Sequence, residues 1–135
     1  MARALAAAAV VAGLAAVAAP PADPSPAGSA VAVALDEWKL VPAQLSVRPG
    51  RIALIVRNDG EMDHELVVLR SDLHHHRLAV NGGRAVEKGR VAELPLIPSG
   101  ATRRLTLTVR PGKYVLLCNL LGHYQAGQYA ALRVR

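Results

Sequence analysis

The segment Cys118–Gln128 reads CNLLGHYQAGQ, and it joins two runs that the sequence predicts to be strands, Lys113–Leu117 and Tyr129–Val134. A thiol at Cys118 and an imidazole at His123 therefore lie in one loop between two strands. Cys118 is the only cysteine, so it cannot form a disulfide within the chain. In an exported protein, a single thiol persists if it is buried, paired between chains or held by a metal.

Copper chemistry gives a reason for a thiol and an imidazole in this arrangement. Copper sites for electron transfer use two imidazoles and one thiolate in a trigonal plane, with a weak axial group. The second imidazole is expected from His64, which opens the predicted strand His64–Leu69 directly after the turn signal Asn58–Gly60. The sequence therefore predicts that His64 meets Cys118 and His123 at one end of the fold.

The rest of the chain favours strands over helices. Two short apolar runs, Ile52–Val56 and Leu66–Leu69, are typical of strands buried on both sides, and the segment Ser71–Glu93 is expected to be an irregular loop with one short helical turn. Many short strands between turns predict an all-β sandwich or barrel. Three other runs have a period of two, in which every second residue lies on the same face; these faces hold Val31, Val33 and Leu35, then Leu105, Leu107 and Val109, and then Ala130, Leu132 and Val134.

The spacing of these residues resembles that of the cupredoxins, and especially their small exported bacterial members. The resemblance covers the chain after its N-terminal linker, and it implies a Greek-key β-sandwich, one type 1 copper ion and electron transfer without catalysis. Its motifs are Asn58-x-Gly60-x3-His64-Glu65-Leu66, Pro111-Gly112-x-Tyr114 and Cys118-x4-His123-x4-Gln128.

The resemblance makes Gln128 the axial ligand, where most such proteins have methionine. Glutamine there resembles the stellacyanin-like plant cupredoxins, and its harder amide oxygen favours Cu(II), so the reduction potential is expected to be lower than that of a relative with an axial methionine. The alternatives are a three-coordinate site from which Gln128 turns away, and Met62 as the axial ligand. Glu65 replaces the polar amide or hydroxyl residue that often steadies the thiolate loop, so Asn119 and Asn58 are the candidates for that support.

Three regions are expected along the chain. Residues 1–19 match a secretory signal peptide, with an uncleaved membrane anchor as the alternative; residues 20–29 form a linker rich in proline, alanine and serine; and residues 30–135 form the cupredoxin domain. The protein is therefore expected to be exported. It is also expected to be a monomer. Its net charge is +6, but the basic residues are scattered, which argues against nucleic-acid binding.

The expected function is electron transfer, with redox partners docking near His123, Leu120 and Leu121; the alternative for these leucines is a loop end tucked into the core. A copper-delivery protein is the alternative function, and a metal-free interaction module is disfavoured by the ligand set. No second copper ligand set or catalytic triad appears, so an enzyme is not expected.

The run His74–His76 is interpreted as a solvated loop, because consecutive side chains of a strand alternate in direction and three of them rarely converge on one ion. Weak metal binding, or help in copper loading, is the alternative. Trp38 is expected to pack against the core.

Overall fold

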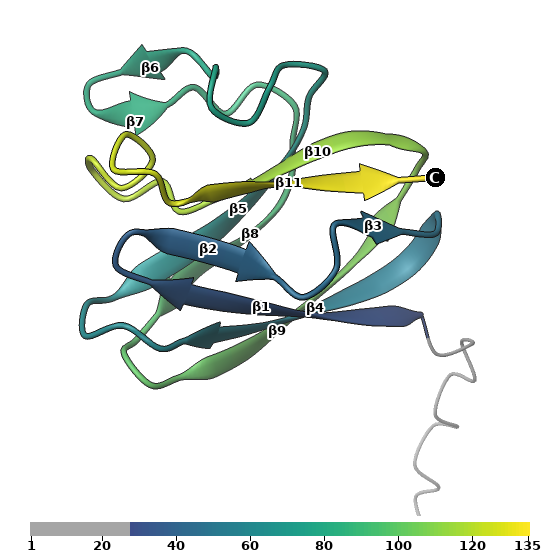
Figure 1. Cartoon of the computed structure of the whole chain (residues 1–135), viewed down its shortest axis with the longest axis horizontal. Coiled ribbons are helices and arrows are strands. Elements are labelled where there is room, and N and C mark those ends of the chain that lie inside the picture. Colours follow the sequence, from purple (N-terminus) through teal and green to yellow (C-terminus); the bar gives the residue numbers. More distant parts are fainter. Residues whose placement is uncertain (1–27) are drawn as a thin grey trace, which may run out of the picture.

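The alternating apolar residues build two main β-sheets, which are arranged as a sandwich (Figure 1). A computed structural model of the protein describes residues 28–135. The predicted signal peptide and nearly all of the predicted linker lie outside the described residues. The first strand begins at Ser29, one residue before the expected start of the domain.

The first sheet has the strand order β2-β1-β4-β9. Its strands are β1 (Ser29–Asp36), β2 (Lys39–Pro42), β4 (Gly50–Asn58) and β9 (Thr102–Val109). β1 runs parallel to β4, and the other neighbours are antiparallel. The hairpin between β1 and β2 is closed by residues 37 and 38, and this short turn reaches the functional site.

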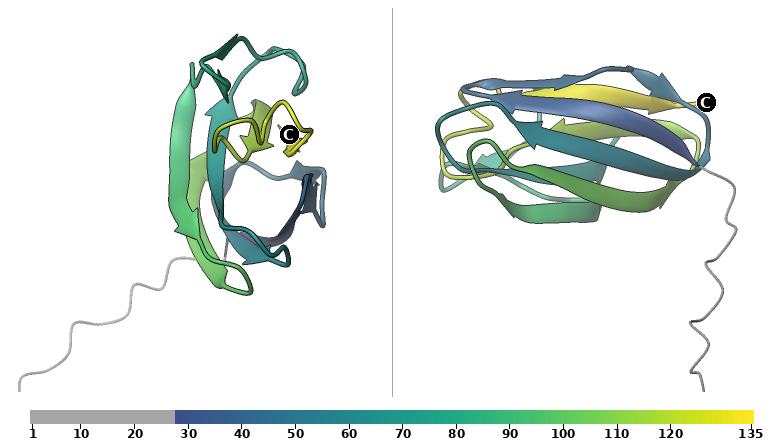
Figure 2. Two further views of the ribbon diagram at one scale, coloured as in Figure 1. Left: turned by 90° about the vertical axis from the view of Figure 1, so that its left-hand side faces the viewer. Right: turned by 90° about the horizontal axis from the view of Figure 1, so that it is seen from below.

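The second sheet has the strand order β3-β11-β10-β5-β8. Its strands are β3 (Ser46–Val47), β11 (Tyr129–Val134), β10 (Gly112–Leu117), β5 (His64–Arg70) and β8 (Arg90–Ile97). Figure 2 shows the strands of both sheets running along the long axis of the molecule, with the connecting loops at its two ends. The predicted all-β sandwich is confirmed.

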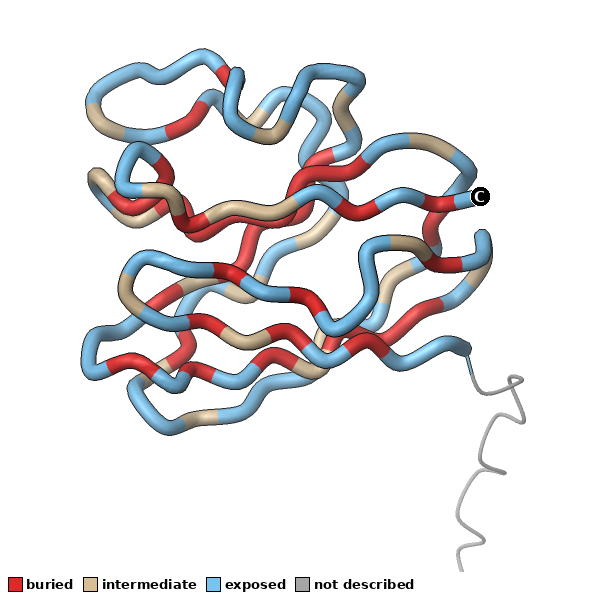
Figure 3. Tube along the Cα trace, in the orientation of Figure 1, coloured by how far each residue is buried: buried red, intermediate tan, exposed pale blue. Residues whose placement is uncertain are grey.

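The main core lies between the two sheets, and the predicted apolar faces supply it. Val31, Val33 and Leu35 of β1 are at most 1% exposed, as their alternation predicts. Leu66 and Leu116 belong to the same cluster from the opposite sheet. Because complete burial of such a side chain contributes about 1.5–3 kcal/mol, this layer holds the sheets together. Figure 3 shows the buried segments concentrated along the strands.

A second, smaller cluster covers the outer face of the second sheet. Over it lies the hairpin of β6 (Val80–Asn81) and β7 (Arg84–Ala85), which is connected through Gly82 and Gly83 with φ angles of 58° and 77°. Both faces of β5 are therefore buried, which confirms the prediction from its apolar run. The cluster consists of Val67, Leu69, Leu78, Ala85, Val115, Leu117 and Tyr124.

The expectation of a short helical turn within Ser71–Glu93 is wrong, because this segment contains no helix. The segment contains a β-turn closed by a hydrogen bond from the Arg77 N–H to the His74 carbonyl (2.8 Å), the β6–β7 hairpin, and the start of β8. Charged residues on the exposed side of β8 hide its strand pattern in the sequence. Residues 28–135 contain no α-helix, and thus none that is long and apolar enough to cross a membrane.

The register of the strands brings three connections to one end of the sandwich. Leu35 pairs with Asn58 at the ends of β1 and β4, and Leu117 pairs with Tyr129 where β10 leaves and β11 returns. The β1–β2 turn, the loop before β5 and the loop between β10 and β11 therefore meet at the end opposite the C-terminus (Figure 1).

Candidate metal centre

Three of the predicted ligands converge at this end. His64 opens β5, Cys118 directly follows β10, and His123 lies in the loop before β11. The Cys118 Sγ lies 3.8 Å from the His64 Nδ1 and 3.4 Å from the His123 Nδ1, and the two nitrogens are 3.3 Å apart. His64 and Cys118 are fully buried, and His123 is 6% exposed. The structure thus brings together side chains that are far apart in the sequence.

The triangle of these three atoms has the size that a single metal ion requires. With metal–nitrogen distances near 2.0–2.1 Å and metal–sulfur distances near 2.3 Å, trigonal ligands lie about 3.5–3.8 Å apart. Both histidines present Nδ1 to the centre. A thiol with two imidazoles is the donor set of type 1 copper, so the residues fit this ion.

Gln128 completes the set. Its side chain is fully buried, and its Oε1 lies 3.1 Å from the His123 Nδ1. Its amide nitrogen donates to the backbone carbonyls of Asp36 (2.8 Å) and Lys39 (3.4 Å), which directs the oxygen toward the other donors. The Met62 side chain is 46% exposed, so Gln128 is the better-placed axial group. The four side chains form a type 1 copper-like site.

Glu37, in the β1–β2 turn, orients His64. Its Oε1 lies 2.9 Å from the His64 Nε2, on the opposite side of the ring from the Nδ1 that faces Cys118. The same carboxylate accepts hydrogen bonds from the N–H groups of Met62 (3.0 Å) and Glu61 (3.1 Å). These N–H groups and His64 lower the pKa of Glu37, so it is an anion at neutral pH. A carboxylate on the outer nitrogen fixes the orientation of a metal-binding histidine and raises its basicity.

Gly60 makes room for this carboxylate. A Cβ atom at position 60 would lie 2.2 Å from the Glu37 Oε1, a distance that real side chains do not adopt. The glycine of the Asn58-x-Gly60 motif therefore has a direct role in admitting Glu37 to His64.

Trp38 covers His123, and its prediction as a core residue is wrong. The indole is 40% exposed, and its ring stands edge-on to the His123 imidazole with centroids 4.8 Å apart. Burial lowers the pKa of His123, and the neighbouring His64 lowers it further. Both effects favour the neutral imidazole that binds a metal.

The thiol of Cys118 is held by backbone groups. The Glu65 N–H donates to its Sγ at 3.4 Å. Burial raises the pKa of the Cys118 thiol, although the N–H groups of Glu65 and Leu120 act in the opposite direction. A metal ion that binds a thiol deprotonates it. Glu65 thus supports the sulfur through its backbone, which makes the identity of its side chain less important here.

The two asparagines proposed as supports brace the loops and make no hydrogen bond to the sulfur. Asn58 donates to the carbonyls of Met62 (2.7 Å) and Ile97 (2.9 Å), which fixes the turn before His64. Asn119 accepts from the Ala85 N–H (2.7 Å) and donates to the Ala85 carbonyl (3.0 Å). The loop after Cys118 is thereby attached to β7.

Substitution of Glu37 tests its role. In Glu37→Gln, an amide replaces a carboxylate of the same shape, so His64 keeps a partner while a negative charge is lost. Charged and neutral hydrogen bonds differ by about 1 kcal/mol, so the reduction potential of the copper-loaded protein should rise by tens of millivolts, with about 59 mV per tenfold change in a one-electron equilibrium.

Glu61→Gln is the matched control for voltammetry. Glu61 is an exposed neighbour whose contact with Glu37 uses only its backbone N–H. Because solvent and salt screen an exposed charge, its potential should stay close to that of the unchanged protein. Equal shifts in the two variants would contradict an orienting role of Glu37.

Comparison with known proteins supports the fold. No protein-family model matches the chain, and no curated protein matches its sequence. The chain is similar to the solved structures of the following three proteins. Reduced auracyanin from Roseiflexus castenholzii has a TM-score of 0.62 and 22% identity, over 81% of this chain and 98% of that one. Rusticyanin from Thiobacillus ferrooxidans has a TM-score of 0.57 and 15% identity, over 81% of this chain and 79% of that one. Auracyanin A from Chloroflexus aurantiacus, described as a "blue" copper protein, has a TM-score of 0.55 and 16% identity, over 79% of this chain and 100% of that one.

Proposed function

We propose that this chain, which has the cupredoxin fold, is a type 1 copper protein that carries electrons between redox partners. The proposal rests on one observation: the His64 Nδ1, Cys118 Sγ and His123 Nδ1 form a buried triangle with sides of 3.3–3.8 Å, and the Gln128 amide oxygen lies beside it. A copper ion in this site would supply one-electron chemistry by alternating between Cu(II) and Cu(I).

The contacts that hold the donor side chains in place favour electron transfer. Glu37 holds His64 from outside, Trp38 packs on His123, and two backbone carbonyls hold the Gln128 amide. The side chains are therefore fixed before a metal binds. A site whose ligands move little between oxidation states exchanges electrons with little rearrangement.

An apolar surface near His123 is suited to docking. We define the docking patch as Trp38, Leu120, Leu121 and His123. Leu121 is 66% exposed, which argues against a loop end tucked into the core. An exposed leucine beside a ligand of the metal fits a surface where a redox partner binds and the electron leaves.

Burial of the donors distinguishes a carrier from a copper-delivery protein. Three of the four donor residues are fully buried and the fourth is 6% exposed. A protein that hands over its ion needs donors that a partner can reach. We therefore favour electron transfer over copper delivery.

The proposed cellular setting follows from the sequence. Residues 1–19 have the pattern of a signal peptide, so we propose an exported protein, anchored to a membrane if the signal stays uncleaved. We propose that it acts as a monomer, with no nucleic-acid partner.

Absorption and electron paramagnetic resonance spectra of the purified protein after addition of one equivalent of Cu(II) test this function. A type 1 site gives an intense thiolate-to-copper charge-transfer band and a narrow copper hyperfine splitting. Rapid, reversible oxidation and reduction at an electrode should accompany them. A pale protein with an ordinary Cu(II) spectrum would refute the assignment.

The docking patch leads to a second test. Leu121→Glu places a carboxylate on the patch, and a partner that buries this charge loses about 1.4 kcal/mol or more, which is a tenfold slower exchange. Leu45→Glu is the matched control, because Leu45 is 67% exposed and lies between β2 and β3, toward the other end of the sandwich.

The measurement is the rate of electron exchange with a redox partner, or self-exchange between two copies, together with the reduction potential. Only Leu121→Glu should slow exchange, and neither change should move the potential appreciably. Equal rates in the two variants would place docking elsewhere.

A further inference from the structure

Three consecutive histidines, His74, His75 and His76, converge in a surface turn. One ring nitrogen of each lies within 4.8 Å of a ring nitrogen of the others. The ring centroids are 4.4 Å apart for His74 and His75, 4.2 Å for His74 and His76, and 5.5 Å for His75 and His76. The sequence-based argument that these side chains point in alternating directions is wrong, because the hydrogen bond from Arg77 to His74 makes the segment a turn and not a strand.

The imidazoles are available to a ligand. His74 and His76 are exposed and His75 is partly buried. Within residues 28–135, their ring nitrogens make no hydrogen bond. Burial lowers the pKa of His75, and the neighbouring charges of His74 and His76 lower it further. The lowered pKa of His75 favours the neutral form of this ring, which is the form that metals bind.

The turn is anchored to the body of the protein. The Tyr124 hydroxyl donates to the His75 carbonyl at 2.9 Å and accepts from the Leu78 N–H at 3.0 Å. The His75 ring also contacts the Tyr129 ring, with centroids 5.4 Å apart. The three histidines thus project from a fixed backbone, which reduces the conformational entropy lost when they bind an ion.

The donor type selects the ion. Imidazole suits copper, nickel and zinc, and among divalent ions Cu(II) binds such ligands most tightly. With metal–nitrogen distances near 2.0–2.1 Å, ligand nitrogens lie about 3–4 Å apart, so small side-chain rotations would close the observed cluster. We propose that His74, His75 and His76 form a second metal site, which takes a divalent late transition-metal ion and prefers Cu(II).

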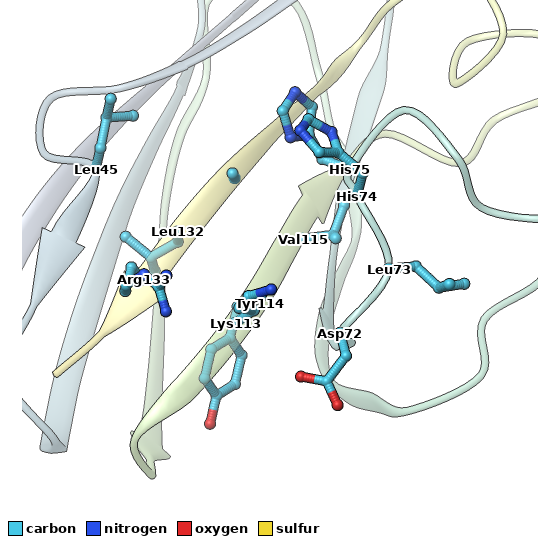
Figure 4. A pocket seen from close by; sticks show the side chains of 11 residues that line it. Leu45, Asp72, Leu73, His74, His75, Lys113, Tyr114, Val115, Leu132 and Arg133 are labelled. Atoms are coloured by element: carbon cyan, nitrogen blue, oxygen red, sulfur yellow. The ribbon is translucent and has the colours of Figure 1, made fainter.

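The surroundings make this second site open. His74 and His75 lie side by side at the edge of a pocket of about 420 Å³, which Asp72, Lys113 and Arg133 also line (Figure 4). Three protein groups would bind the ion, and the exposed rings of His74 and His76 would leave it accessible to solvent. An ion held in this way exchanges readily, in contrast to one held by buried donors.

The two sites share supports but no ligands. Tyr124 follows His123 and Tyr129 follows Gln128, and both tyrosines contact His75. Removal of the histidine side chains therefore leaves the donors at Cys118 intact, and removal of the thiol leaves the three histidines intact. Failure of one proposal can thus be separated from failure of the other.

The test is a titration of the full chain, made without a polyhistidine tag, with Cu(II) under electron paramagnetic resonance. Two signals are expected: one with narrow hyperfine splitting from the buried site, and an ordinary Cu(II) signal with wide splitting from the histidine turn. The triple variant His74→Ala, His75→Ala, His76→Ala should keep the first and lose the second, with the bound copper falling from about two ions to about one per chain.

Controls make the result specific. Leu73→Ala, a neighbouring exposed change, should keep both signals, and Cys118→Ser should lose only the narrow one. His76→Ala removes one exposed ring and should weaken the second site about tenfold or more, which gives a test that does not depend on the folding of the triple variant. Absence of the wide signal in the unchanged protein, or its survival in the triple variant, would overturn the proposal.

Discussion

The Cys118→Ser variant should remain folded yet lose all intense visible absorption when copper is added. The colour of a type 1 site comes from charge transfer out of a copper-bound thiolate, and a serine hydroxyl neither ionises nor bonds copper in this way at neutral pH. The buried hydroxyl keeps the Glu65 N–H as a partner, so the free energy of unfolding should fall by only about 1–2 kcal/mol.

Circular dichroism, thermal unfolding and the absorption spectrum together check this expectation. An unfolded variant would leave the spectrum uninformative, and Cys118→Ala then provides the same test without a buried hydroxyl. A folded variant that stays intensely blue would show that another group gives the colour, and the thiolate assignment would be lost.

The Gln128→Met variant should have a higher reduction potential than the unchanged protein. A thioether is a weaker and softer axial donor than an amide oxygen, so Cu(II) loses more stabilisation than Cu(I). We expect the shift to exceed about 59 mV, the value of one tenfold change in a one-electron equilibrium. Methionine also cannot donate to the carbonyls of Asp36 and Lys39, so stability should fall by about 1–2 kcal/mol.

Gln125→Met is the matched control. Gln125 lies in the same loop, but its side chain is exposed. The same substitution there changes composition equally without touching the four donors, and its voltammogram should match that of the unchanged protein. If Gln128→Met also leaves the potential unchanged, Gln128 is not the axial ligand.

Much of the fold follows from local sequence pattern. The alternation Val31, Val33, Leu35 predicts which face of β1 is buried, because successive side chains of a strand point to opposite faces. β8 was missed because charged residues interrupt its pattern and its neighbour β5 is distant in sequence. Pairing between distant strands depends on the whole sandwich, and a local window cannot reveal it.

The residues of the site also divide into those that local sequence reveals and those that it does not. Cys118, His123 and Gln128 share one short loop, so their spacing identifies them in the sequence, and His64 is recognisable from the turn before it. Glu37 lies 27 residues before His64 with no local signal, and only the pairing of β1 with β4 brings it to the ring. The histidine run shows the reverse case: its residues are conspicuous, but their convergence depends on a turn that the sequence pattern did not predict.

The strand register also decides how the protein can be attached to something else. Ser29 pairs with Ile52 and Val134 pairs with Gly112, so both ends of the folded chain lie at the end of the sandwich away from the four donors. A chain fused or chemically coupled after Arg135 would point its copper-binding end outward. Immobilisation on an electrode through that terminus should therefore orient every molecule with its donors away from the conducting surface, whereas a thiol introduced at Leu121 should orient them toward it.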